Sequence, residues 1–209
     1  MSTQRDSAFK DCYIMQHDDI ERFADTLADG FRQYALFQYI CGGVYDHDKI
    51  KRFWAVSIAL APANAVCIAD SEEINSVLIY IPPKSPEPGI LSYLKVGGVK
   101  MYLKMGMQWL YRLLRFDSAV QKMASRHKTD DDGYLMAFAT RIDKQGQHYG
   151  KPLMDALLRY LDASDEGCYL ETLKEGNVPL YNHFSFELKE QKALDFGNLT
   201  LYAMYRPRK

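Results

Sequence analysis

The sequence predicts an α/β fold in which helices flank a mixed, largely antiparallel sheet. Residues 134–172 read as a strand, a glycine-containing turn, a helix and a second strand, and such a crossover places its two strands parallel in one sheet. Two short apolar runs, 65–69 and 76–81, flank an acidic turn and predict a β-hairpin. The runs 186–189 and 199–205 predict a pair of strands that closes the sheet.

Length and composition are those of an ordinary globular protein. The 209 residues, of which 47% are apolar and 25% are charged, fit a single domain over 1–209 that buries a substantial core. The net charge of −1 provides no general attraction to nucleic acid or to an anionic membrane, so we expect neither as a partner.

No targeting or membrane-spanning segment is readable in the sequence. Residues 1–15 lack the apolar core of a secretory signal. The longest apolar run, 55–63, is far shorter than the roughly 20 residues that span a bilayer. The four cysteines have no C-x-x-C spacing and the histidines no metal-ligand spacing, so we expect a reduced, cytoplasmic protein without a metal site.

Helical periodicity dominates the first part of the chain. Apolar residues recur at three- and four-residue steps over 17–40, which predicts one amphipathic helix that Gly30 weakens near its middle. A second amphipathic helix is predicted over 46–61, with Asp46 as its N-cap. Residues 90–127 are also helical in pattern and rich in Met and Leu, and we expect them to form an insertion in the single domain.

The turn at 145–150 is a candidate anion site, because it joins a strand to a helix and has the sequence Gln-Gly-Gln-His-Tyr-Gly. Free N–H groups, the helix dipole and the close approach that glycines allow favour a phosphate here, and Lys151 would add a point charge. The spacing excludes a Walker A loop, because three residues rather than four separate the glycines and Pro152 follows the lysine. The dinucleotide fingerprint G-x-G-x-x-G is absent too. An ordinary strand-to-helix turn is the alternative.

In this setting the turn resembles motif A of the GNAT superfamily of N-acetyltransferases, whose successive amides hold the pyrophosphate of acetyl-CoA. Gln145, Gly146 and Gly150 agree with the pattern Gln-x-x-Gly-x-Gly, whereas His148 replaces its central glycine. We expect His148 to be tolerated with a negative φ, so that its amide still donates. A base role suits His148 less, because a phosphate cradle is poorly placed for the amine. The resemblance implies that these residues bind the cosubstrate: Gln145, Gly146, Gln147, His148, Tyr149, Gly150 and Lys151.

A second and more specific resemblance lies at 168–186. Its segments Cys-Tyr-Leu-Glu-Thr, Asn-Val-Pro-Leu-Tyr and Ser-Phe are similar to the GNAT segment YLET…NVPLY…GF, with Ser185 in place of a glycine. Serine is strained there if the position needs a positive φ. Asn177 and Tyr181 are four residues apart and share one helix face.

The resemblance gives these two residues roles. It implies that Asn177 contacts the pantetheine arm or the helix opening. It also implies that the Tyr181 hydroxyl lies near the thioester sulfur and protonates the departing thiolate, which suits a phenol with a pKa near 10. Taken alone, Tyr181 would be an ordinary core or surface aromatic.

Two further parts of the site follow from the same resemblance. The strand before the turn corresponds to the GNAT strand whose edge amides contact the acetyl and pantetheine groups, here Phe138, Ala139 and Thr140. Glu171 precedes the end of the next strand and is a candidate general base for the amine, directly or through water. Two alternatives stay open: a structural carboxylate that caps the neighbouring loop, or deprotonation through ordered water and backbone carbonyls without a dedicated base.

The segment 90–127 has two interpretations. Met101, Met105 and Trp109 recur at four-residue steps, which predicts a core stripe opposite a solvated basic face. Alternatively, these helices wall the acceptor pocket, because methionine-rich surfaces adapt to varied ligands.

Together these patterns predict a GNAT-like domain whose two central parallel strands splay apart. The expected reaction is direct transfer of acetyl from acetyl-CoA to a primary amine, with Tyr181 as general acid and Glu171 as candidate base. We expect a small-molecule amine or a peptide amine as acceptor, and a homodimer is left open. The alternative is a catalytically weak or inactive module of the same fold that binds CoA or another acyl-CoA, which His148 and Ser185 favour.

Overall fold

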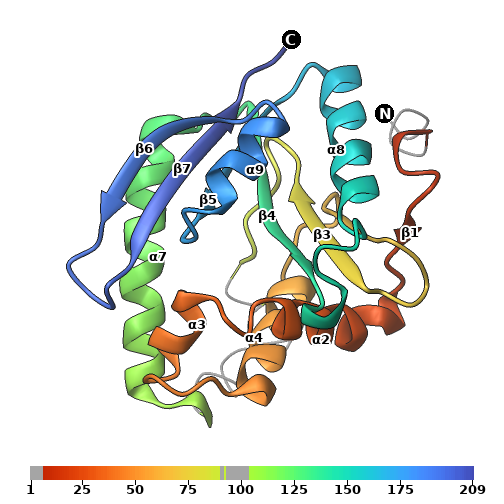
Figure 1. Cartoon of the computed structure of the whole chain (residues 1–209). Coiled ribbons are helices and arrows are strands. Elements are labelled where there is room, and N and C mark those ends of the chain that lie inside the picture. The colour runs from red at the N-terminus through yellow and green to blue at the C-terminus, as the bar shows by residue number, and fades with distance from the viewer. Residues whose placement is uncertain (1–6, 90–91, 93–103) are drawn as a thin grey trace.

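The computed structural model describes residues 7–89, 92 and 104–209 (Figure 1). Within these residues the strands form a seven-stranded sheet in the order β1-β2-β3-β4-β5-β7-β6, and β4 and β5 are its parallel pair. The strands are β1 (Tyr13–Ile14), β2 (Val66–Ala69), β3 (Ser76–Ile81), β4 (Asp132–Thr140), β5 (Gly167–Thr172), β6 (Glu187–Ala193) and β7 (Thr200–Arg206). The predicted mixed, largely antiparallel sheet is confirmed. Only β1 was missed, because two residues are too short to show a pattern.

Helices cover both faces of this sheet (Figure 1). They are η1 (His17–Asp19), α2 (Ile20–Gly30), α3 (Ala35–Ile40), α4 (His47–Ala59), α7 (Met107–His127), η2 (Ile142–Lys144), α8 (Lys151–Ser164) and α9 (Asn177–His183). The predicted cap of α4 is confirmed, since the Lys49 N–H donates to the Asp46 carboxylate at 3.1 Å. None of the described helices is long and apolar enough to cross a membrane.

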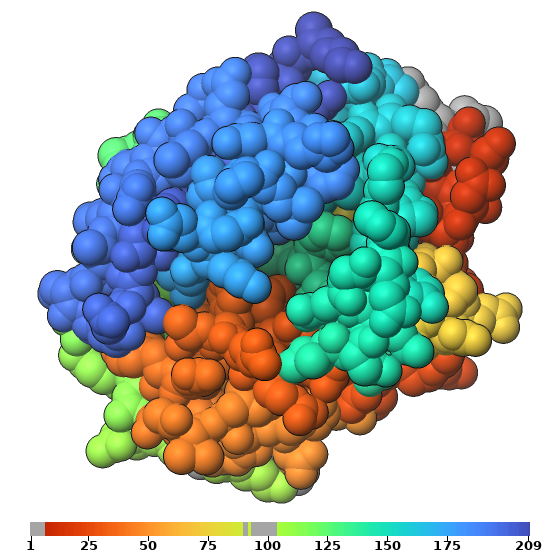
Figure 2. All heavy atoms as spheres, viewed as in Figure 1, coloured from red at the N-terminus to blue at the C-terminus, as the bar shows by residue number. Residues whose placement is uncertain are grey.

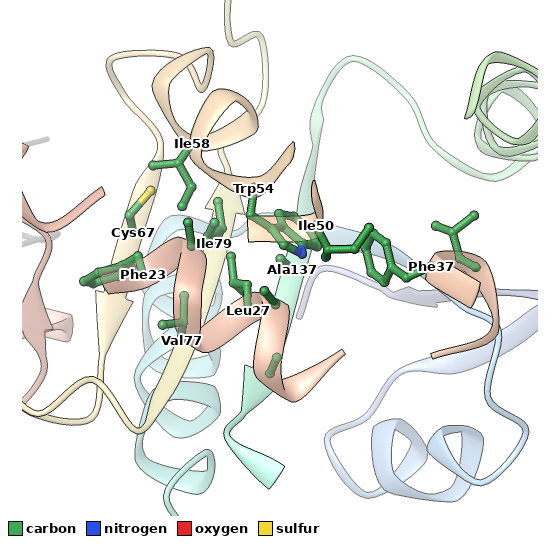
Figure 3. Packing of buried hydrophobic residues seen from close by; sticks show 14 of the residues in the cluster. Phe23, Leu27, Phe37, Ile50, Trp54, Ile58, Cys67, Val77, Ile79 and Ala137 are labelled. Carbon is green, nitrogen blue, oxygen red and sulfur yellow. The ribbon is translucent and has the colours of Figure 1, made fainter. Parts of the chain in front are cut away.

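The two larger hydrophobic cores lie on opposite sides of the sheet because side chains alternate along each strand, and a smaller third cluster packs Met123 of α7 against β5 and β7. Val77 and Ile79 of β3 belong to the first core, which packs α2, α3 and α4 against the sheet (Figure 3). Leu78 and Tyr80 of the same strand belong to the second core, with α8 and α9. The strands that carry the site are therefore held from both faces.

The predicted helix over 17–40 is wrong in its extent, because the chain forms η1, α2 and α3 here and α2 ends at Gly30. The reason is a close approach between α2 and β4. A Cβ atom on residue 30 would lie 2.7 Å from the carbonyl oxygen of Thr140, which is closer than such atoms pack. Only glycine fits at this contact, and because the chain leaves the helix there, Tyr34 lies in the short connection to α3.

Helix α7 confirms the helical pattern for 107–127. Residues 90–91 and 93–103, and with them Met101, lie outside the described residues. Met105 and Trp109 are buried in the first core, as expected for a core stripe. Further along α7, Phe116 and Asp117 line a cavity, so this helix also contributes to the site.

The parallel strands β4 and β5 stay paired only near their starts. Residues 132–134 pair with 167–169, whereas β4 continues to pair with β3 as far as Thr140. The register with β3 shifts at Ile79/Tyr80, which leaves Met136 as an extra, bulged residue on β4. The two strands diverge beyond Tyr134, and the predicted splay is confirmed.

Candidate active site

Two adjoining cavities open where β4 and β5 diverge. The turn-side cavity, of about 440 Å³, reaches Thr140 and Gln145. The aromatic cavity, of about 360 Å³, reaches Phe37 and Trp54. Figure 2 shows a hollow on this face, bordered by the orange helices near the N-terminus, the teal turn before α8 and the blue region of α9. The two cavities share six of their lining residues: Phe31, Tyr34, Phe138, Leu173, Asn177 and Tyr181.

The backbone of β4 presents polar groups to the splay. The Arg141 N–H donates to the Asn75 carbonyl at 2.9 Å, on the β3 side. Because hydrogen bonding alternates along an antiparallel strand, the N–H of Ala139 also faces β3, whereas those of Phe138 and Thr140 face the splay. All three predicted strand residues line the turn-side cavity, but the Ala139 N–H, expected among the edge amides, pairs with β3 instead.

The turn at 145–150 offers free hydrogen-bond donors. Within the part of the chain that the structure describes, the N–H groups of Gly146, His148, Tyr149 and Gly150 have no hydrogen-bond acceptor. They precede the first turn of α8, a 14-residue helix whose dipole places partial positive charge at this end. Unsatisfied amides at a helix start fit a phosphate or pyrophosphate group.

The backbone of the turn corrects one expectation. His148 has a φ of 65°, not the negative value expected, and Gly146 has a φ of 75°. The position that the GNAT pattern gives to glycine therefore keeps the left-handed conformation although a histidine occupies it. A residue with a Cβ atom is strained there by about 1–2 kcal/mol.

The end of the turn lies directly on β4. A Cβ atom on residue 150 would come within 2.7 Å of the Phe138 ring, so only glycine fits without a shift. The Gln145 side-chain amide donates to the Thr140 carbonyl at 3.0 Å, which ties the other end of the turn to the same strand. Lys151, a predicted phosphate ligand, pairs with Asp155 at 2.5 Å along the exposed face of α8.

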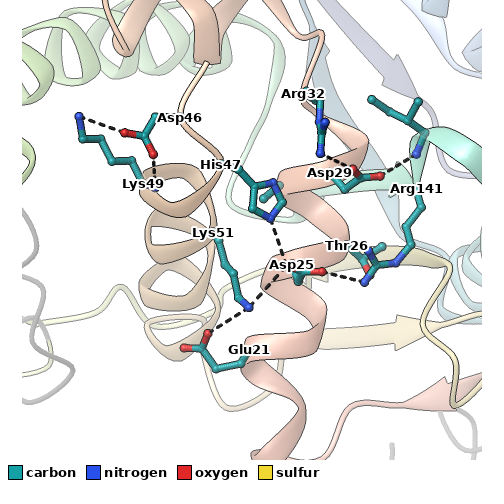
Figure 4. Close-up of polar contacts among 12 residues, drawn as sticks. Glu21, Asp25, Thr26, Asp29, Arg32, Asp46, His47, Lys49, Lys51 and Arg141 are labelled. Atoms are coloured by element: carbon teal, nitrogen blue, oxygen red, sulfur yellow. Dashed lines mark hydrogen bonds and ion pairs between the residues drawn. The ribbon is translucent and has the colours of Figure 1, made fainter. Parts of the chain in front are cut away.

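Acidic residues of α2 hold the start of this turn (Figure 4). The Ile142 N–H donates to the Asp29 carboxylate at 2.8 Å, and Arg141 pairs with Asp25 at 3.0 Å. His47 and Lys51 of α4 contact the same Asp25 carboxylate, at 3.1 and 3.4 Å. The network fixes α2, α4 and the turn relative to one another.

Helix α9 brings Asn177 and Tyr181 to the junction of the cavities, as their spacing predicted. The Asn177 side-chain amide donates to the Thr172 hydroxyl oxygen at 3.0 Å. The Tyr34 hydroxyl lies 3.3 Å from the same oxygen and accepts the Leu173 N–H at 2.6 Å. Tyr34 was missed because 138 residues separate it from Thr172 and no local pattern marks it.

Tyr181 is buried and packs edge-on against Phe186. Burial raises the pKa of its hydroxyl well above the usual value, and the nearby Tyr34 and Cys168 add to this effect. Among the described residues the hydroxyl has no hydrogen-bond partner. Tyr181 therefore offers the cavities that it lines a neutral O–H without a hydrogen-bond partner among the described residues.

The turn that follows α9 contains Ser185 at a φ of 66°, so the serine does occupy a position with positive φ.

Glu171 lines the aromatic cavity. Burial raises the pKa of its carboxyl from 4.5 to about 7, and interactions with the hydroxyls of Tyr134 and Tyr169 partly offset the effect. The loop after β5 takes its hydrogen bonds from Thr172 and Tyr34. Because other residues already hold this loop, Glu171 is better suited to act as a general base near neutral pH than as a structural carboxylate that caps the loop.

Solved structures match the chain over almost its full length. No protein-family model and no curated protein sequence matches it. An acetyltransferase of Corynebacterium glutamicum, described as histone acetyltransferase HPA2 and related acetyltransferase, has a TM-score of 0.63 at 18% identity, with 95% of this chain and 96% of that chain covered. Mosquito arylalkylamine N-acetyltransferase like 5b has a TM-score of 0.58 at 15% identity, with 93% and 98% covered. The C-terminal condensation domain of Ebony, in complex with beta-alanyl-dopamine, has a TM-score of 0.60 at 8% identity, with 93% and 97% covered.

The chain has the GNAT fold. The likeness to these structures and the splayed parallel pair of the sheet agree on this point. Identities below 20% show the fold and do not carry over a reaction or an acceptor. The function has to be inferred from the site itself.

Proposed function

We propose that this chain transfers acetyl from acetyl-CoA to a primary amine. The observation that carries the proposal is the arrangement at the splay. A turn with free amides adjoins the joined cavities, and a buried tyrosine hydroxyl lies where they meet. The turn can bind the phosphates of a thioester cosubstrate, and the tyrosine can give a proton to its sulfur. The edge of β4 lies between them, so the arrangement is suited to thioester cleavage. The fold adds support, because several structures that share it are named as acetyltransferases.

In this proposal the turn at 145–150 binds the pyrophosphate of acetyl-CoA through its free N–H groups and the dipole of α8. The backbone of β4 at 138–140 contacts the pantetheine arm and the acetyl group. Asn177 contacts the arm from the opposite strand. Lys151 would assist the phosphates after leaving Asp155, and the side chains of Gln145 and Gln147 hold the turn through bonds to Thr140 and Asp143.

Acetyl-CoA supplies an acetyl group activated as a thioester. The Phe138 N–H faces the splay and would stabilise negative charge on the carbonyl oxygen during attack by the amine. A C–N bond forms as the C–S bond breaks, and the amine loses one proton while the sulfur gains one. Tyr181 donates the proton to sulfur, because its raised pKa keeps it protonated at neutral pH.

Glu171 is the group that deprotonates the ammonium form of the acceptor before attack, directly or through water, whereas the second proton, which nitrogen loses as the C–N bond forms, balances the one that Tyr181 gives to sulfur. A primary ammonium must be deprotonated before it can attack, and a base with a pKa near 7 is well matched to neutral pH. Glu171 and Tyr181 line the same aromatic cavity, which supports their roles as base and acid toward one acceptor.

The test is CoA release from acetyl-CoA with a panel of amines, for the wild-type protein and Tyr181→Phe. We expect kcat to fall about 100-fold in the variant, the lower end of general-acid effects, with an unchanged KM for acetyl-CoA. Tyr202→Phe is the matched control, since Tyr202 is buried in β7 and lines neither cavity. An unchanged kcat in Tyr181→Phe would contradict the general-acid role.

A second candidate is a catalytically weak or inactive module that binds CoA or another acyl-CoA. The left-handed His148 and Ser185, both at positions where the GNAT pattern has glycine, favour it. Acetyl-CoA would raise the Tm in both cases, but only the enzyme would release CoA when an amine is added. No rise in Tm at millimolar acetyl-CoA would count against both candidates.

A further inference from the structure

The aromatic cavity has an unusually apolar wall. Rings from α3, α4, α7 and the segment between α2 and α3 line it, among them Phe31, Phe37, Phe53, Trp54 and Phe116. The rings support one another, since Phe31 stacks on Trp54 with centres 5.4 Å apart and Phe37 meets Trp54 edge-on at 5.8 Å. Such a wall offers apolar area and ring faces but few hydrogen-bonding groups.

The charged groups of this cavity are acidic. Asp117 and Glu171 line it, and its wall, as far as the structure describes it, includes no lysine, arginine or histidine. A ligand carboxylate or phosphate in this cavity would lie beside two carboxylates and no cation of the lining, which is unfavourable. A cationic head on an apolar body fits the same wall, through the carboxylates and the ring faces.

Asp117 lies on α7 where the aromatic cavity adjoins a third one. This proline-side cavity, of about 660 Å³, is bordered by Pro82, Pro86 and Pro88 and shares Asp117 with the aromatic cavity; Glu87 and Lys128 line it as well, so carboxylates outnumber cations in its wall by two to one. The Asp117 carboxylate accepts a hydrogen bond from the Gln121 side-chain amide at 2.7 Å. Asp117 is exposed on α7 and makes no ion pair with any described residue, and partial desolvation by its neighbours raises the pKa of its carboxyl.

Building on the proposed acetyl transfer, we infer that the acceptor is a primary amine on an aromatic or branched apolar body without an acid group, and that Asp117 binds its ammonium. The amine enters past Asp117 from the proline-side cavity, and the body packs on the rings of Trp54 and Phe116. The nitrogen then reaches Glu171, where it loses its proton. Asp117 is a specificity-determining residue in this inference and takes no part in the chemistry.

Two other amine classes fit less well. A peptide brings backbone N–H and C=O groups that would be buried against rings without partners. A polyamine brings a second ammonium, yet Glu171 is ionised only in part near pH 7, so Asp117 alone would have to balance both charges. Both classes serve as comparisons in the test.

The first measurement compares kcat/KM for amines that differ in one feature. Phenylalanine is 2-phenylethylamine with an added carboxylate, and putrescine replaces the ring by a second amine. We expect the kcat/KM for 2-phenylethylamine to be about tenfold or more above the values for phenylalanine, putrescine and the dipeptide Phe-Gly. A difference of this size corresponds to one well-placed apolar group or one unpaired charge. Equal or greater kcat/KM for any of the three would overturn the inference.

The second measurement uses Asp117→Asn, which keeps the shape of the side chain and removes its charge. We expect the KM for 2-phenylethylamine to rise about tenfold with kcat nearly unchanged, and the KM for acetyl-CoA to stay the same. Asp18→Asn is the control, because Asp18 is exposed and lines none of the three cavities. An unchanged KM for the amine in Asp117→Asn would remove Asp117 from the inference.

A binding measurement separates this inference from the proposed function. Trp54 lines the aromatic cavity and is one of two tryptophans, so Trp109→Phe leaves it as the only indole reporter. Quenching of Trp54 by 2-phenylethylamine but not by phenylalanine would support the acceptor class even if no CoA were released. CoA release with putrescine alone would support the proposed reaction and contradict the acceptor class.

Discussion

The side-chain amide of Asn177 donates a hydrogen bond to the Thr172 hydroxyl oxygen over 3.0 Å, and this bond ties the start of α9 to the end of β5. The same oxygen accepts the Lys174 N–H at 3.3 Å and lies 3.3 Å from the Tyr34 hydroxyl. Because α9 carries Tyr181, one hydroxyl positions the proposed general acid relative to the sheet.

The variant Thr172→Val keeps the side-chain shape and removes the shared acceptor. Leaving buried donors unpaired should lower the free energy of unfolding by about 1–3 kcal/mol. It should also lower kcat for acetyl transfer, because Tyr181 loses its fixed position. Urea denaturation and steady-state CoA release measure the two effects.

Thr26→Val provides the matched control for that variant. Thr26 of α2 is fully buried, donates to the Ile74 carbonyl at 2.6 Å and lines neither of the two site cavities. We expect a similar loss of stability without a change in kcat. A kcat that falls equally in both variants would show that stability alone, and not the position of α9, limits the rate.

Most of the fold could be predicted because its elements carry local patterns. The hairpin at 65–81 and the α8 segment show clear periodicity, and their bounds differ by only one or two residues from the structure. Gly30 could be predicted only as a weak point of the helix and not as its end, because the close approach of Thr140 comes from a strand over 100 residues away.

The site was predictable to the same degree. The resemblance of the turn and of the segment around Tyr181 placed both at the splay, where the structure brings them together. Tyr34 lies in the connection between α2 and α3 and Asp117 lies on α7, and neither belongs to a recognisable motif, so only the folded chain shows that they line the cavities. The φ of His148 depends on the path of the turn, which the residue type does not determine.

Folding stability should depend on pH through Glu171. Its pKa is about 7 in the folded chain and near 4.5 when exposed, so the folded state binds the proton more tightly. The contribution is therefore complete below about pH 4.5 and is lost as the pH rises to about 7, by roughly 1–3 kcal/mol. Glu171→Gln should remove this dependence and be more stable than the wild type at pH 8, as thermal denaturation across pH would show.

The same group should govern the rate of acetyl transfer. If Glu171 is the base, kcat/KM for the amine should rise with pH through about 7 as the carboxyl ionises, in addition to the ionisation of the free amine. Glu171→Gln should abolish this rise in kcat/KM near pH 7 and lower the kcat/KM reached at higher pH about 100-fold. A pH profile that is unchanged in Glu171→Gln would favour deprotonation through water and backbone carbonyls.

The two strained positions allow a paired experiment on cosubstrate binding. His148 and Ser185 both have a φ near 65°, where glycine is unstrained. His148→Gly and Ser185→Gly should each raise the free energy of unfolding by about 0.5–1 kcal/mol, the relief of strain less the added chain entropy. Only His148→Gly should change the affinity for acetyl-CoA, measured by calorimetry, because Ser185 lies outside the turn. Equal effects of both variants on that affinity would show that the turn does not bind the pyrophosphate.

The contact between Gly150 and Phe138 gives the sharpest test of the turn. An alanine at 150 would place its Cβ 2.7 Å from the Phe138 ring, so either the ring or the turn must shift. We expect Gly150→Ala to weaken acetyl-CoA binding about tenfold, equivalent to about 1.4 kcal/mol. Gly89→Ala is the control, because a Cβ there meets no atom within 4 Å and neither glycine has a positive φ. Replacing the ring with Phe138→Leu in the Gly150→Ala background should restore part of the affinity. Without such a recovery, the loss would come from the turn backbone itself and not from the contact with β4.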